Sequence, residues 1–81
     1  MNDVVAHGIP DGYRLQDKDI INCDIVCYKN GFHGDNSGMV MIGNVNDEIR
    51  RLSEETRNAM FEAIKICKPG TPFREIGRTI E

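Results

Sequence analysis

In the sequence NCDIVCYKNGFHGDNSG, residues 22–38, the apolar run Ile25-Val26-Cys27 precedes the pair Asn30-Gly31, and Phe32 follows it directly. A two-residue type I′ turn requires positive φ at both central positions, and Asn-Gly is the pair that best accepts this conformation. The sequence therefore predicts an antiparallel β-hairpin with strands over residues 20–29 and 32–42.

Two aspartates interrupt the apolar pattern of this hairpin. In the register set by the turn, Asp24 opposes Ser37 and Asp35 opposes Val26, so the aspartates are diagonal neighbours on one face. Such pairs lie about 7–8 Å apart by Cα. Aspartate is uncommon in strands, and two like charges on one face repel each other. Either both carboxylates face solvent on the polar side of the hairpin, or they share one or two divalent cations.

Helical spacing of apolar residues predicts a helix over residues 47–67, which ends before Pro69-Gly70. Thr71 and Pro72 are then expected to begin a second helix, as N-cap and first helical residue. Residues 1–19 are rich in turn signals and predict a loop. The last strand residues, 39–42, either continue the second strand or begin a third.

These elements predict an α+β fold: one small domain over residues 1–81, or part of a larger one. We expect the long helix to bury its apolar residues, among them Leu52, Met60 and Ile64, against the apolar face of the first strand. That face consists of Ile21, Cys23, Ile25 and Cys27.

Composition narrows the classes of partner. The chain has a net charge of −3, and its basic residues form no patch, so we expect neither nucleic acid nor a membrane surface as partner. It has three cysteines with no C-x-x-C pair, which disfavours a disulfide framework or a zinc ribbon. We expect reduced, partly buried thiols in a reducing, cytoplasmic location.

The two histidines are further candidates for a site. His7 precedes Gly-Ile-Pro, a context typical of a structural loop residue, and His33 shares a face with Asp35 opposite Tyr28. By residue type alone, each is more often a packed neighbour than a ligand.

Several motifs together resemble those of the type I methionine aminopeptidases, which have the pita-bread fold. They are H-G-I-P-D, two aspartates separated by ten residues with the second in G-F-H-G-D, then K-P-G and R-E-I-G, in the order typical of that family. The resemblance covers essentially the whole chain and implies the N-terminal half of that fold.

The resemblance implies metal-dependent removal of N-terminal methionine from peptides or nascent proteins. Asp24 resembles the aspartate that ligates one ion through two oxygens, Asp35 the aspartate that bridges two ions, and His7 a histidine that contacts substrate. The complete family site holds two divalent ions (Co, Mn, Fe or Zn). The family's remaining ligands, one histidine and two glutamates, belong to a C-terminal half, which the chain would require for activity.

Some positions depart from the family pattern. Val26 stands where a hydroxyl residue commonly supports the metal ligands, Ala6 replaces a common cysteine, and Asn36 and Gly38 are unusual after the second aspartate. An alternative is therefore a non-catalytic module of the same fold, or a truncated homologue without activity. A homo-oligomer that shares ligands is less well supported, because no residue here matches the missing histidine and glutamates.

Overall fold

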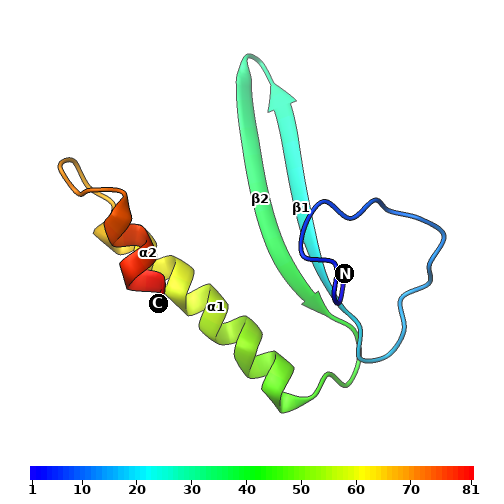
Figure 1. Ribbon diagram of the computed structural model, residues 1–81. Helices are drawn as coiled ribbons and strands as arrows, with labels where there is room; N and C mark the ends of the chain where they lie inside the picture. The colour runs from blue at the N-terminus through cyan, green and yellow to red at the C-terminus, as the bar shows by residue number, and fades with distance from the viewer. The chain divides into compact units, whose positions relative to one another are not determined.

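The computed structural model describes all 81 residues and confirms an α+β chain (Figure 1). The residues group into two compact units, 1–46 and 47–81. The prediction that residues 1–81 form part of one domain stays a prediction. No helix is both long and apolar enough to cross a membrane. The elements, in chain order, are β1 (Ile20–Lys29), β2 (Phe32–Met41), α1 (Asp47–Ile66) and α2 (Arg74–Ile80).

The first unit contains the predicted hairpin. Its strands pair antiparallel from Lys29 opposite Phe32 to Ile20 opposite Met41, which is the predicted register. Asn30 and Gly31 have φ values of 53° and 87°, as a type I′ turn requires. The second strand continues to Met41, so the alternative of a third strand is excluded.

Backbone pairing extends beyond the strands at the open end of the hairpin. The Lys18 amide donates to the Ile42 carbonyl at 2.8 Å, and the Ile42 amide donates to the Asp19 carbonyl at 2.9 Å. Next to this pair, Asp17 Oδ1 accepts a hydrogen bond from the Asn44 amide at 2.8 Å. Residues 17–19 therefore hold the segment that leaves β2.

The second unit contains two helices. The long helix α1 is one residue shorter than predicted, and α2 folds back beside its C-terminal part (Figure 1). The predicted start of α2 at Thr71-Pro72 is wrong, because α2 begins at Arg74. The Glu75 amide donates to the Pro72 carbonyl at 3.0 Å, which is an i to i+3 bond. A tight turn of 3₁₀ type therefore occupies the predicted first helical residues.

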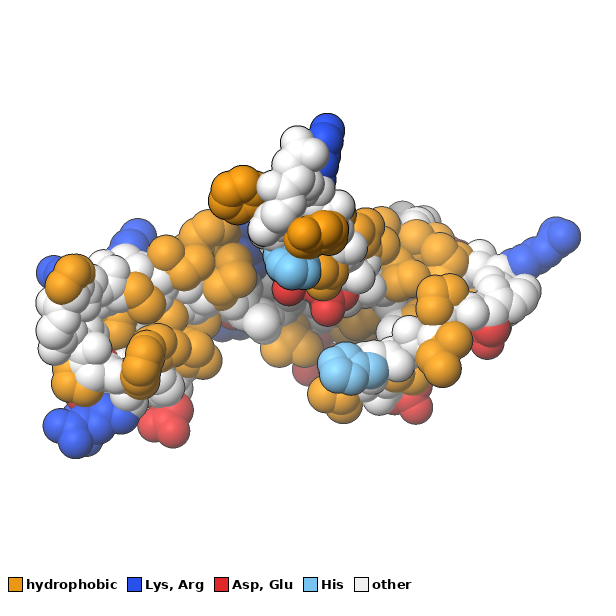
Figure 2. Space-filling model, turned by 90° about the horizontal axis from the view of Figure 1, so that it is seen from above, with side chains coloured by type: hydrophobic (Ala, Val, Ile, Leu, Met, Phe, Trp, Pro, Cys, Tyr) orange, Lys and Arg blue, Asp and Glu red, His pale blue; other side chains and the backbone are white.

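Burial within the two units is slight. The predicted packing of the long helix on β1 would join one unit to the other, so it stays a prediction. Val45 and Ala63 are the only buried hydrophobic residues, while Leu52, Met60 and Ile64 are 64%, 47% and 55% exposed. Figure 2 shows hydrophobic side chains spread over the visible surface. So short a chain has little surface that it can bury.

The three cysteines are free and exposed, which corrects the expectation of partly buried thiols. On the hairpin the reason lies in the register. Cys23 opposes Gly38 and Cys27 opposes Gly34, so neither thiol has a partner side chain directly across the ladder.

Candidate metal-binding face of the hairpin

The register places Asp24 and Asp35 on the same face of the hairpin. Asp24 pairs with Ser37, and Asp35 pairs with Val26. Successive residues of a strand alternate between faces, so Asp24 and Val26 share a face with their partners. The aspartates are diagonal neighbours across the ladder, as the sequence predicted, and both are exposed.

A hydrogen bond on the same face shows how close side chains come along this diagonal. Ser37 Oγ donates to Asn22 Oδ1 at 2.7 Å. Asn22 pairs with Met39, and Ser37 lies two residues before Met39 in β2. In the same way, Asp24 pairs with Ser37, and Asp35 lies two residues before Ser37. Asp24 and Asp35 thus repeat this arrangement one step nearer the turn. We expect their carboxylates to reach a common cation.

Near the two aspartates, the same face of the hairpin carries the rings of Tyr28 and His33 and the aliphatic side chain of Val26. The Tyr28 and His33 rings lie 4.8 Å apart between centroids at 49°. His33 therefore has the packed-neighbour role expected for it. Val26, 62% exposed and directly opposite Asp35, brings no hydroxyl or amide to orient that carboxylate.

The ligand set is small. No group of three or more His, Cys, Asp and Glu side chains is placed to hold a metal ion anywhere in the chain. Carboxylate oxygens suit hard divalent cations, but such ions take about six ligands each. The donor chemistry of Asp24 and Asp35 fits part of a divalent-metal site. Their assignment as ligands stays a prediction.

His7 lies in the loop that precedes β1. It is exposed and has a φ of 56°, in the left-handed region that few residues other than glycine adopt. It forms no group with the two aspartates that could hold a metal ion. Its role toward a substrate also stays a prediction.

The sequence analysis missed a cluster around Asp19, the only buried charged residue. Asp19 Oδ1 accepts from Asn2 Nδ2 at 2.9 Å, and Oδ2 accepts from the Gln16 amide at 2.9 Å. The Gln16 amide and then the Asn2 side chain lower the pKa of Asp19, and the Tyr13 hydroxyl contributes less. Partial burial and then Asp19 raise the pKa of Tyr13. No sequence motif indicated this role of Asp19, because its hydrogen-bond partner Asn2 lies 17 residues away in the sequence.

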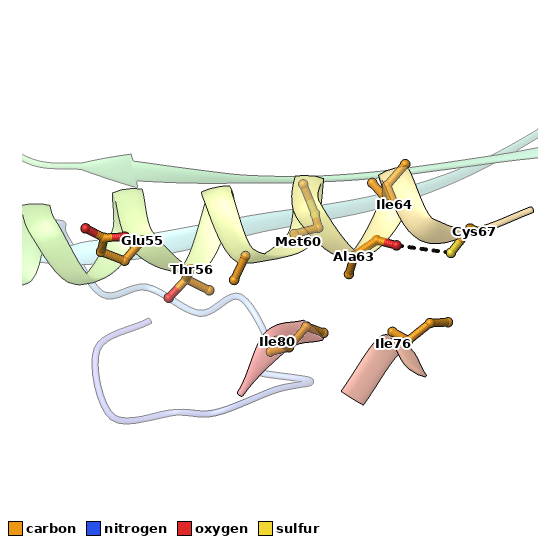
Figure 3. Close-up of a pocket in the computed structure, with 9 residues that line it drawn as sticks. Glu55, Thr56, Met60, Ala63, Ile64, Cys67, Ile76 and Ile80 are labelled. Carbon is orange, nitrogen blue, oxygen red and sulfur yellow. Dashed lines mark hydrogen bonds between the residues drawn. The ribbon is translucent and has the colours of Figure 1, made fainter. Parts of the chain in front are cut away.

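The helical unit has an apolar groove between α1 and α2 (Figure 3). The Cys67 thiol, directly after α1, donates to the Ala63 carbonyl at 3.2 Å, so it is engaged with the C-terminal end of that helix. The groove offers apolar surface but no set of catalytic side chains. Its lining residues are Glu55, Thr56, Ala59, Met60, Ala63, Ile64, Cys67, Ile76 and Ile80.

A comparison with protein families identifies the class to which this chain belongs. The model of metallopeptidase family M24 matches residues 1–81, and the chain belongs to that family. The family name implies use of a metal in general; it specifies neither the element nor the number of ions.

Curated relatives are similar over almost the whole chain. Methionine aminopeptidase 1D, mitochondrial, of Mus musculus is 49% identical over 80 residues, which are 99% of this chain and 24% of that protein. The chloroplastic/mitochondrial form of Arabidopsis thaliana is 44% identical over 99% of this chain and 23% of its own length. Methionine aminopeptidase of Chlamydia trachomatis serovar D is 46% identical over the whole chain and 28% of its own length. The chain thus spans about a quarter of these relatives.

Proposed function

We propose that this chain supplies part of the active site of a methionine aminopeptidase, which removes the N-terminal methionine of peptides or nascent proteins. The observation that carries the proposal is the register that places Asp24 and Asp35 on one face, in a chain of the M24 family. The relatives named above supply the substrate class by their names.

In this proposal, Asp24 and Asp35 hold divalent metal through carboxylate oxygens, and His7 contacts the substrate beside the scissile bond. Two ions of Co, Mn, Fe or Zn would supply Lewis-acid chemistry when bound. The paired negative charges are then tolerable on one face, because bound cations offset their repulsion. A further polypeptide segment must supply the other ligands, since no third ligand lies near the pair. Exposed free thiols favour a reducing compartment, and we propose the cytoplasm.

The isolated chain is expected to bind divalent metal weakly and to release no methionine. Two carboxylates provide a minority of the ligands that two such ions require. Calorimetric titration of the 81-residue chain with Mn²⁺, followed by assay of methionine release from a Met-Gly peptide, checks this expectation. Tight binding with turnover that disappears in Asp24→Asn would show that the chain is sufficient alone, against the proposal.

A chimera tests the proposal directly. This chain would replace the matching 81 residues of the Chlamydia trachomatis methionine aminopeptidase, to which it is 46% identical. We expect a chimera that releases N-terminal methionine and loses this activity on chelation of metal. A folded chimera that binds no metal would contradict the proposal.

The alternative is a binding module of the M24 fold without catalysis. Val26 opposite Asp35 favours it, because this position offers no hydrogen bond to the carboxylate. Such a module would form a folded chimera that binds a methionyl peptide without hydrolysing it.

Introducing a hydroxyl at this position should strengthen metal binding. Val26→Thr keeps the side-chain shape and places a donor directly across the ladder from Asp35. Groups that orient metal ligands typically change metal affinity by about 10–100-fold. We expect an increase of up to about tenfold in the Mn²⁺ affinity of the chimera, measured by calorimetry. Val40→Thr is the matched control, because Val40 pairs with Ile21 on the opposite face; an equal gain there would refute the explanation.

A further inference from the structure

Both ends of the loop that carries His7 form hydrogen bonds to the same side chain, that of Asp19. At its beginning, the Asn2 side chain donates to Asp19 Oδ1 at 2.9 Å. At its end, the Gln16 amide donates to Asp19 Oδ2 at 2.9 Å. The backbone adds one bond at each end, from the Asn2 amide to the Ile20 carbonyl at 3.0 Å and from the Asp19 amide to the Gln16 carbonyl at 3.2 Å.

The Asn2 side chain both donates and accepts a hydrogen bond. While its Nδ2 donates to Asp19, its Oδ1 accepts from the Ile20 amide at 3.0 Å. The side chain of Asn2 thus ties the chain start to the first residue of β1, the strand that carries Asp24. Figure 1 shows the N-terminal segment returning to the start of β1.

Little else holds this loop. Residues 1–18 are almost all exposed, including Val5 at 101% and Ile9 at 88%. An exposed loop without buried apolar contacts opens at low free-energy cost. Its position relative to the strand therefore depends on the few hydrogen bonds at its ends, and Asp19 accepts two of them.

We propose that Asp19 is a positioning residue: through Asn2 and Gln16 it closes the loop of residues 3–15, which carries His7, at the start of the strand that carries Asp24. The loop closure stands on the structure alone, whereas the consequence for substrate rests on the proposed function. Asp19 itself contacts neither substrate nor metal in this proposal.

The test compares amide hydrogen exchange in the 81-residue chain and its Asp19→Ala variant, followed by NMR. We expect exchange at Asn2, Gln16 and Ile20 to accelerate about tenfold or more, because two hydrogen bonds to a charged group are lost. The amides of the hairpin near Asn30-Gly31 should keep their protection. Unchanged exchange at all three reporters would overturn the proposal.

A matched control and a rescue separate this role from general destabilisation. Asp17→Ala removes a carboxylate that binds the Asn44 amide, and it should leave the exchange of the three reporters unchanged. The double variant Asn2→Asp with Asp19→Asn exchanges the carboxylate and the side-chain amide. The Gln16 amide, the Ile20 amide and the side-chain amide then each retain an acceptor. The double variant should restore slow exchange at all three amides. Failure of this rescue, or equal acceleration in Asp17→Ala, would overturn the proposal.

Kinetics of the chimera connect the loop to the reaction. Asp19→Ala should lower kcat/KM about tenfold, and the exchanged pair should recover most of it. If the chimera is inactive, the proposed function fails while the exchange experiment still decides on loop closure. An active chimera whose kcat/KM is unaffected by Asp19→Ala would overturn the positioning role.

Discussion

Asp35→Asn in the chimera should reduce methionine release about a thousand-fold, which corresponds to about 4 kcal/mol of lost transition-state stabilisation. The substitution keeps the size of the side chain and removes its charge and one anionic oxygen. Metal ions contribute several kcal/mol to such reactions, and Asp35 is one of the two residues that we propose would hold them. The measurement is kcat/KM with a Met-Gly peptide at saturating Mn²⁺.

Two companion variants make this result specific. Asp24→Asn should cause a loss of similar order, because both carboxylates lie on the same face of the hairpin. Asp3→Asn changes the net charge equally at an exposed position and should retain full activity. Full activity of Asp35→Asn with normal metal content would rule out the proposed metal-binding face.

Gly43→Ala should destabilise the first unit by about 2–3 kcal/mol. Gly43 has a φ of 63°, where a residue with Cβ is strained by about 1–2 kcal/mol. An added Cβ would also overlap Asp17 Oδ1, so the Asp17 side chain must move. That movement breaks the hydrogen bond from the Asn44 amide, worth about 1 kcal/mol. Urea denaturation followed by circular dichroism measures the change.

A double-mutant cycle with Asp17→Ala separates the two causes. In the Asp17→Ala background no carboxylate opposes the new methyl group, so Gly43→Ala should cost only the strain of the backbone, about 1–2 kcal/mol. Equal costs of Gly43→Ala in both backgrounds would show that the contact with Asp17 is unimportant. Gly12→Ala is the control, because a Cβ there meets nothing within 4 Å.

Local sequence determined the hairpin because its cause is local. Positive φ at Asn30 and Gly31 selects one turn type, and that turn sets every cross-strand pair, including Asp24 with Ser37. The face shared by Asp24 and Asp35 follows from alternation along the strands. The extent of α1 was likewise predictable within one residue, since an apolar repeat and a Pro-Gly stop act over a few residues.

The features decided only by tertiary structure depend on residues distant in sequence or on surface that a short chain cannot bury. Asp19 became a buried carboxylate because Asn2, 17 residues away, folds back onto it, and no local pattern encodes that contact. The Asp17–Asn44 contact joins residues 27 apart for the same reason. Burial of Leu52 and Ile64 was predicted from apolar spacing, yet spacing shows only which face of a helix is apolar. Whether that face is covered depends on how much apolar surface the folded chain can bring together.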